Sequence, residues 1–210
     1  MKNTFQKIAF FVVILITNLQ AQSDWQLAKE KDGIKVYLRN YKGGKLKELR
    51  AICTIKSSLH AVNAVMKDVP NAKNWINKID ESILLKQMPD GTLYKYFVIA
   101  VPFPLKNRDV IYHEHSVQEK SDKSLIFSST SIPDYQPEKD GLVRMIDTQG
   151  SWKFTPKGNG ELDVVYQLYA DPAGIPVWVA QDRENLIADG QRATDVIPIP
   201  VPSAPGRTVA

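Results

Sequence analysis

The segment 92–117 constrains the fold of this chain more than any other part of the sequence. A run of mostly β-branched and aromatic residues meets Pro102 and Pro104, and a second strand-like run starts at Arg108. Proline fixes φ and lacks the N–H that a β-ladder needs, so a central strand cannot continue through these two prolines. The chain must turn there, which predicts two strands joined by a proline-rich loop. The second strand places Arg108 and Asp109 at the mouth of the surface that the strands cover.

Most of the remaining chain shows the alternation of apolar and polar residues that is typical of half-buried strands. Residues with turn chemistry, mainly glycine, proline, aspartate and asparagine, separate these runs. One face of such a sheet is expected to be covered and the other to face water. We predict antiparallel strands at 34–38, 46–55, 82–88, 93–101, 108–118, 125–131, 142–154 and 162–169.

Three segments are predicted to be helical. Residues 25–29 are expected to form one or two turns. After the second predicted strand, Ser58 offers an N-cap, and apolar residues recur at helical spacing over 59–69 until Pro70 ends the run. Near the C-terminus, 177–189 contains good helix formers and is followed by glycine, a common helix stop.

The first residues are typical of a secretory signal peptide. Lys2 and Lys7 supply positive charge, an apolar run covers 8–16, and a small residue, Ala21, ends the segment. The apolar run is shorter than the roughly 20 residues that a membrane-spanning helix needs. We therefore expect residues 1–21 to be removed and the protein to be exported, either to a periplasm or to the outside of the cell.

The chain of 210 residues is long enough for one domain with its own core. We place this domain at 22–189 and expect the proline-rich segment 190–210 to form an extended or disordered tail. Loss of Lys2 and Lys7 lowers the formal net charge from +4 to +2. Because this charge is small and evenly scattered, the sequence does not favour nucleic-acid binding.

Two single residues are given structural roles. Cys53 is the sole cysteine, so it cannot form a disulfide within the chain, and its apolar neighbours predict a small buried hydrophobe. Trp75 follows the short helix in a polar setting. Its large apolar area predicts that it anchors this loop.

The strand predicted at 93–101 has two rather apolar faces. Tyr94, Tyr96 and Val98 share one face, and only Lys95 interrupts the apolar residues of the other. One face is expected to line a cavity while the other packs on a helix, or both belong to an ordinary core. The sequence leaves these alternatives open, because the same residue types line a filled core and a hollow one.

Two histidines of the next strand invite a metal-site hypothesis. His113 and His115 share one face, with Glu114 on the other, and the third histidine, His60, lies in the predicted short helix. A tetrahedral zinc site needs a third and a fourth ligand. We therefore expect no metal and no cofactor, with the histidine pair on the solvated face.

Four blocks of sequence, in this order and spacing, resemble the START lipid-transfer family within the helix-grip group of folds. They are Trp25 with 32–37 (DGIKVY), 102–112 (PFPLKNRDVIY), 150–154 (GSWKF) and 171–180 (DPAGIPVWVA). The resemblance implies an α+β fold of the START/Bet v 1-like type. In this fold a curved antiparallel sheet wraps around a C-terminal helix, and a short helix follows the second strand.

The resemblance also implies a function. A lipid or other hydrophobic ligand is expected to bind non-covalently, with transfer between membranes in some family members, in a tunnel between the sheet and the C-terminal helix. Such a protein is not an enzyme, is expected to be a monomer, and contacts a membrane only transiently. The expected ligand-binding residues are Arg108, Asp109, Tyr94, Tyr96, Val98, Tyr112, Trp152, Phe154, Tyr166 and Trp178.

The roles of Arg108 and Asp109 have two interpretations. They are neighbours in a strand, so their side chains leave opposite faces and cannot form a simple pair with each other. In the first interpretation Arg108 lies at one tunnel end and offers planar donors to a ligand carboxylate or phosphate. In the second, both residues hold loops by hydrogen bonds, because arginine is usually structural or exposed.

Two other functions stay open. The same scaffold could carry a cyclase-like or hydrolase-like enzyme that uses Asp109, His113, Glu114 or His115 in the cavity. Alternatively, the chain could be a protein-interaction module whose proline-rich tail binds a partner.

Overall fold

The computed structural model describes residues 24–44 and 46–174. The predicted signal peptide 1–21, the predicted helix 177–189 with Trp178, and the predicted tail 190–210 lie outside these residues. Within the described part of the chain, no helix combines the length and the apolar character needed to cross a membrane.

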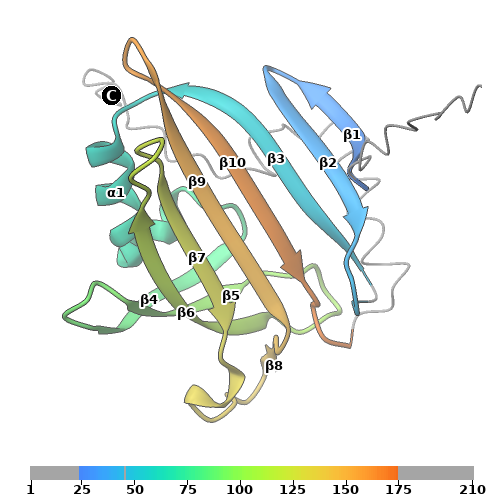
Figure 1. The fold of residues 1–210 in the computed structure, drawn as a ribbon. Coiled ribbons are helices and arrows are strands. Elements are labelled where there is room, and N and C mark those ends of the chain that lie inside the picture. Colours follow the sequence, from blue (N-terminus) through green and yellow to red (C-terminus); the bar gives the residue numbers. More distant parts are fainter. Residues whose placement is uncertain (1–23, 45, 175–210) are drawn as a thin grey trace, which may run out of the picture.

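The described residues form one large sheet of ten strands, shown in Figure 1. The order is β1-β2-β3-β10-β9-β7-β6-β5-β4, and β8 lies beside β6 off this path. All of these pairs are antiparallel except β6 with β8. The strands are β1 (Gln26–Lys31), β2 (Ile34–Asn40), β3 (Lys47–Lys56), β4 (Ile79–Gln87), β5 (Leu93–Ile99), β6 (Arg108–Gln118), β7 (Leu125–Ser131), β8 (Val143–Arg144), β9 (Thr148–Gly158) and β10 (Glu161–Ala170).

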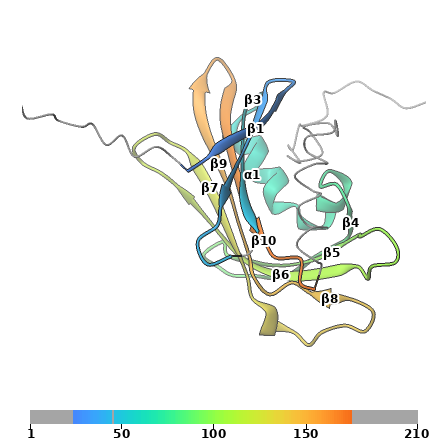
Figure 2. The same ribbon diagram turned by 90° about the vertical axis from the view of Figure 1, so that its right-hand side faces the viewer.

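The sheet is strongly bent, and its concave side holds the helical segments. In Figure 2 the strands of the β3, β9 and β10 region stand upright, while β4 and β5 run across their lower end. Helix α1 (Leu59–Lys67) and the 3-10 helix η1 (Val69–Asn74) lie in the angle between these two parts. A second 3-10 helix, η2 (Pro133–Tyr135), belongs to the connection after β7.

Helix α1 starts where the sequence predicts. The Ser58 hydroxyl oxygen accepts a hydrogen bond from the Ala61 N–H at 3.2 Å, which satisfies one of the free donors at the helix start. Val62 and Met66 are the buried residues of this helix. The predicted short helix is therefore confirmed, although it follows the third strand because β1 precedes the two strands that were predicted.

Two predictions of local structure are wrong. Residues 25–29 do not form helical turns, because Gln26–Lys31 pairs with β2 as strand β1, and so short a helix gains little stability by itself. The segment 142–154 is not one strand. β8 pairs with β6 whereas β9 pairs with β7, so the chain has to leave one partner strand before it reaches the other.

The proline-rich loop joins two neighbouring strands, as predicted. β5 and β6, on either side of it, pair antiparallel from Leu93 with Glu114 to Ile99 with Arg108. The hairpin between β4 and β5 also has its predicted turn, in which the Met88 N–H donates to the Thr92 carbonyl at 2.8 Å.

Two apolar clusters pack on opposite faces of the sheet. The larger lies between α1 and the concave face and consists of Ile34, Val36, Ala51, Cys53, Val62, Met66, Phe127, Trp152, Phe154, Leu162 and Val164. The smaller contains Tyr96, Val98 and Ile111, with Ile132 and Leu142 of the segment 132–147 packed against it. Strands β5 and β6 are therefore covered on both faces.

The Cys53 thiol should react only after unfolding. It is buried in the larger cluster, and burial, together with the Asp163 carboxylate, raises its pKa to about 11. Because the thiolate is the reactive species, folded protein at about pH 8 should resist iodoacetamide, whereas denatured protein should be alkylated fully. Intact mass spectrometry measures both. Equal rates of alkylation in the folded and denatured states would contradict this expectation.

Candidate functional site

A cavity of about 230 Å³ lies between the concave face of the sheet and the segment formed by α1 and η1. Most of its lining is aliphatic or aromatic, with few polar side chains. Pockets for drug-sized molecules typically measure about 300–1,000 Å³, so this volume suits a slender or compact molecule. The lining residues are Met66, Val69, Ala72, Trp75, Ile76, Asn77, Ile79, Lys95, Phe97, Ile99, Val110, Tyr112, Glu114, Ser129, Gly150, Trp152, Tyr166 and Leu168.

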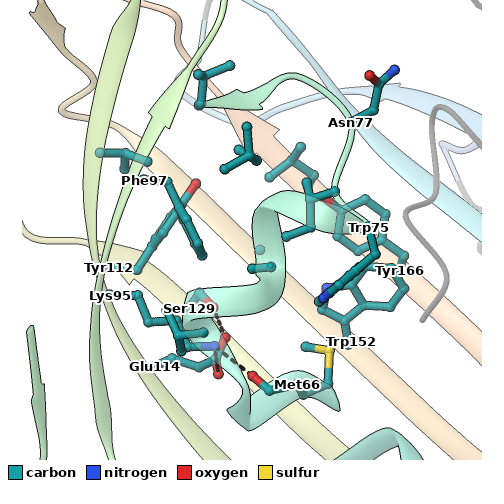
Figure 3. Close-up of a pocket in the computed structure, with 18 residues that line it drawn as sticks. Met66, Trp75, Asn77, Lys95, Phe97, Tyr112, Glu114, Ser129, Trp152 and Tyr166 are labelled. Atoms are coloured by element: carbon teal, nitrogen blue, oxygen red, sulfur yellow. Dashed lines mark hydrogen bonds and ion pairs between the residues drawn. The ribbon is translucent and has the colours of Figure 1, made fainter. Parts of the chain in front are cut away.

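Aromatic rings line two sides of the cavity. Trp152 of β9 and Tyr166 of β10 are partners across the strands, and their rings stack with centroids 4.2 Å apart. In Figure 3 these rings and Trp75 lie together on one side, and Phe97 and Tyr112 lie on the other. Such walls offer flat apolar surfaces to a hydrocarbon or ring system.

An ion pair between Lys95 and Glu114 lies inside this apolar cavity. Each side chain is only 6% exposed. The Lys95 ammonium also donates to the Met66 carbonyl oxygen at 3.3 Å, and Glu114 accepts a hydrogen bond from the Ser129 hydroxyl at 2.7 Å. Figure 3 shows these contacts at the end of the cavity away from Asn77. They join β5, β6 and β7 to the last turn of α1.

Lys95, Glu114 and Ser129 form a polar cluster. The charges of Lys95 and Glu114 cancel, so the cluster has no net charge. Burial of charge is tolerated when a partner of opposite sign is in contact, as here. The neighbouring Tyr112 also stays uncharged. Loss of water around its hydroxyl, and to a lesser extent the nearby Tyr166, raise the pKa of Tyr112 far above its usual value. The cavity therefore offers hydrogen-bonding groups with balanced charge.

Three of the residues predicted to bind ligand line the cavity. They are Tyr112, Trp152 and Tyr166. Phe154 is fully buried in the larger cluster, with its ring stacked at 5.8 Å from that of Trp152. Trp178 lies outside the described residues.

Tyr94, Tyr96 and Val98 do not line the cavity. The face of β5 that carries Lys95 turns towards the cavity, so alternation along the strand directs these three side chains to the convex face. There the Tyr94 ring stacks on Tyr135 at 4.8 Å, while Tyr96 and Val98 belong to the smaller cluster. The structure thus selects one of the two strand faces that the sequence could not distinguish.

Arg108 and Asp109 are buried and hold loops. The Arg108 guanidinium donates to the carbonyl oxygens of Pro172 at 3.1 Å and Ala173 at 3.3 Å. Asp109 accepts two hydrogen bonds from Arg144, at 3.0 and 2.9 Å. Neither residue lines the cavity. Of the two interpretations, these contacts match the one in which both residues hold loops.

The two strand histidines lie apart from the cavity. The ring of His113 packs edge-on against Tyr94 on the convex face, and its centroid is 6.4 Å from that of His115. Glu114, between them in sequence, faces the cavity instead. Within residues 24–44 and 46–174, no group of three or more His, Cys, Asp or Glu side chains is placed to hold a metal ion.

The pair of Lys95 and Glu114 was not predicted from the sequence. Lys95 was interpreted as an interruption of an apolar face, and Glu114 was considered only together with the histidines. A lysine on an otherwise apolar strand face needs a buried acidic partner, so the signal was present. Trp75 was predicted only to anchor its loop, and it also lines the cavity.

The bent antiparallel sheet, the short helix after β3 and the apolar cavity between them define an α+β protein with a START-like fold. The chain belongs to the START domain family, whose model, described as START domain, matches residues 15–185. The family resemblance seen in the sequence is therefore confirmed.

Individual relatives agree with this assignment. The chain is 37% identical over 158 residues to Uncharacterized protein PA1579 of Pseudomonas aeruginosa, across 75% of this chain and 77% of the relative. It is 28% identical over 163 residues to Phosphatidylcholine transfer protein of Rattus norvegicus, across 75% of each. The crystal structure of the STAR-related lipid transfer protein from Xanthomonas axonopodis is similar with a TM-score of 0.70 at 34% identity, across 76% of this chain and 89% of that one.

Proposed function

We propose that this protein binds a lipid or another apolar molecule non-covalently in its cavity, as a carrier and not as an enzyme. The observation that carries the proposal is the apolar cavity of about 230 Å³, with the polar cluster at one end. Two similar proteins support the ligand class by their names, which are phosphatidylcholine transfer protein and STAR-related lipid transfer protein.

The energetics of hydrocarbon burial favour a ligand of this class. Burial of an alkyl chain contributes about 0.8 kcal/mol per methylene, so about ten methylenes give roughly 8 kcal/mol. Losses of translational freedom and ordering of side chains reduce this to roughly micromolar affinity. Such an affinity suits a carrier, because the bound molecule can leave again.

Further parts of the proposal concern the two ends of the chain and the oligomeric state. We propose that the predicted helix 177–189 closes the cavity, and the match of the family model as far as residue 185 supports this. We also propose that the protein is exported after removal of 1–21 and acts as a monomer. The positive charges and apolar run at the start of the chain support export.

Native mass spectrometry tests the central proposal. Protein purified under mild conditions should carry an added mass that is lost on denaturation. After removal of lipid, the same protein should take up the neutral probe N-phenyl-1-naphthylamine with a saturable rise in fluorescence. A bare mass together with no probe uptake would contradict ligand binding.

The loop between β5 and β6 presents an exposed aromatic side chain near the cavity. Phe103 is 96% exposed and lies between two prolines, with an exposed lysine, Lys106, in the same loop. The loop starts beside the cavity-lining strand ends, where the Ala100 N–H donates to the Lys78 carbonyl at 2.8 Å. Aromatic rings flanked by lysine suit the interface of a bilayer. We therefore propose that Phe103 makes the transient membrane contact.

Phe103→Ser should weaken binding to vesicles of phosphatidylcholine and phosphatidylglycerol by about 10- to 150-fold. The reason is the loss of about 1.5–3 kcal/mol of apolar transfer free energy for one phenylalanine side chain. Vesicle sedimentation measures the bound fraction. The matched control is Leu27→Ser, which removes a 55% exposed apolar side chain from β1 and should have little effect. Similar losses for both variants would argue against a specific role of this loop.

A further inference from the structure

Two arginine side chains lie over one tryptophan ring on the convex face of the sheet. The Cζ atom of Arg39 is 4.3 Å from the centroid of the Trp25 ring, and the Cζ atom of Arg50 is 4.2 Å from it. The same strands carry Val36 and Ala51, which belong to the larger cluster on the concave face. Alternation along each strand therefore directs the two arginines to the convex face. Attraction between a guanidinium group and an indole face keeps both groups at this place.

The neighbouring side chains of β3 and β10 hold these arginines but leave most of their N–H donors unused. Glu48 accepts a hydrogen bond from Arg39 Nε at 2.7 Å, and its side chain is only 11% exposed. Gln167 lies opposite Arg50 across β3 and β10. With its amide oxygen turned towards the guanidinium, it accepts from Arg50 Nε at 3.3 Å and from Nη2 at 3.0 Å. In the part of the chain that the structure describes, no acceptor is found for the Nη groups of Arg39 or for Nη1 of Arg50.

The charges at this place do not balance. Among the described residues, Arg39 and Arg50 share the one carboxylate of Glu48, so one positive charge is in excess. Burial and the positive charge of Arg39 lower the pKa of Arg50, and Glu48 only partly opposes this effect. Two like charges so close together repel each other. A further anion in contact with both guanidinium groups would relieve this repulsion.

The surrounding strands add to the positive potential. Residues 24–56, which contain β1, β2 and β3, have nine Lys or Arg and four Asp or Glu, a net charge of +5. Residues 57–174 have thirteen Lys or Arg and fifteen Asp or Glu, a net charge of −2. Positive charge is therefore concentrated at one edge of the sheet, although it is small for the whole chain. Such a region attracts anions from solution.

We propose that Arg39 and Arg50 bind one singly charged oxyanion, a carboxylate or a phosphodiester, on the convex face of β2 and β3. A planar guanidinium pairs with two oxygens of either group, and one negative charge balances the excess of the site. Trp25 and Gln167 position the two guanidinium groups. The site goes beyond the proposed function, because it lies on the face of the sheet opposite the cavity.

The indole N–H signals of the tryptophans test this site by nuclear magnetic resonance. In ¹⁵N-labelled full-length protein, dimethyl phosphate and acetate should each shift the Trp25 signal with saturation. Two charge-assisted hydrogen bonds correspond to dissociation constants on the order of 1 mM. Uncharged trimethyl phosphate should shift nothing. Trp25→Phe identifies the signal, and the signals of Trp75 and Trp152, which line the cavity, should stay in place. Absence of a saturable Trp25 shift with both anions would overturn the proposal and leave the proposed function standing.

Charge-changing variants separate this site from general attraction by positive charge. Arg50→Gln should weaken binding of dimethyl phosphate about tenfold, because the charged donors are lost. Lys35→Gln is the matched control, since it removes the same charge from the same face of β2, where Lys35 pairs with Glu30 at 3.6 Å. Its affinity should stay within about twofold of the unmodified protein, because exposed charges are screened.

Glu48→Gln removes the carboxylate that competes with the ligand, so it should strengthen binding about tenfold. A merely structural role of the two arginines would not produce this gain. Circular dichroism checks that each variant is folded. Equal losses in Arg50→Gln and Lys35→Gln, or a weaker affinity in Glu48→Gln, would also overturn the proposal.

Vesicles distinguish the two sources of a phosphodiester, which are a free molecule and a lipid head group. If the occupant is a head group, Arg50→Gln should bind vesicles of phosphatidylcholine and phosphatidylglycerol about tenfold more weakly than Lys35→Gln in sedimentation. If both variants bind vesicles equally while dimethyl phosphate shifts the Trp25 signal, the occupant is a free anion. Either result supports the site, because the Trp25 signal defines it.

Discussion

Arg144→Met is expected to lower the free energy of unfolding by about 3–5 kcal/mol, because it leaves the Asp109 carboxylate buried without its partner. The side chains of Arg144 and Asp109 are 2% and 1% exposed, and two hydrogen bonds join them. The same guanidinium donates to the carbonyl oxygens of Pro133, Gln136 and Pro137. One side chain thus holds the segment 132–147 on the convex face of β6.

Urea unfolding followed by circular dichroism measures this loss, and a double variant identifies its cause. In Asp109→Leu/Arg144→Met the lone charge is absent, so part of the lost stability should return. The recovery should be incomplete, since the carbonyl groups of the segment 132–147 still lack their donor. If the single and the double variant both match the unmodified protein within about 1 kcal/mol, the pair does not have this role.

Gly150→Leu is expected to weaken ligand binding by about 5- to 150-fold while the fold is retained. Gly150 lines the cavity from near the start of β9, and its backbone lies outside the left-handed region. A Cβ atom there would meet Leu168 Cδ1 at 3.5 Å and the Gln167 carbonyl oxygen at 3.6 Å, which are ordinary contacts. The rest of a leucine side chain would then enter the space meant for ligand. Overpacking costs of about 1–3 kcal/mol would fall on the bound state and give the stated range.

The control for this variant is the neighbouring residue. Ser151→Leu adds a side chain of the same size on the opposite face of β9, where it should leave affinity unchanged. Titration with N-phenyl-1-naphthylamine gives the dissociation constants, and circular dichroism checks that both variants are folded. Equal affinities of Gly150→Leu and the unmodified protein would mean that ligand binds elsewhere.

Local sequence signals predicted most of the sheet and its short helix. The two prolines after β5 and the alternation in β6 are properties of a few adjacent residues, so the turn and both strands could be read directly. The strand β1 was missed because its stability comes from pairing with β2, which is a tertiary effect on a segment of weak propensity.

The composition of the site was harder to predict than the strands. Tyr94 and Phe97 lie on opposite faces of β5 and have similar chemistry, so only the position of α1 decides which of the two faces borders the cavity. Lys95 and Glu114 are 19 residues apart, and their contact depends on the register of two strands. Arg108 and Asp109 could be identified from the sequence as candidate site residues. Their burial under loops could not be inferred from neighbouring residues.

The coverage of β5 and β6 on both faces has a consequence for how the binding site adapts. Ile132 and Leu142 pack against the convex face of these strands. The backbone that carries their cavity-facing side chains is therefore held in place. On the other side, α1 rests on the sheet through apolar contacts and the bond between Lys95 and the Met66 carbonyl. The Ser82 hydroxyl of β4 joins η1 to the sheet, because it donates to the Pro70 carbonyl at 3.0 Å and accepts from the Lys73 N–H at 3.3 Å. We therefore expect ligands of different width to displace α1, while β5 and β6 keep their positions.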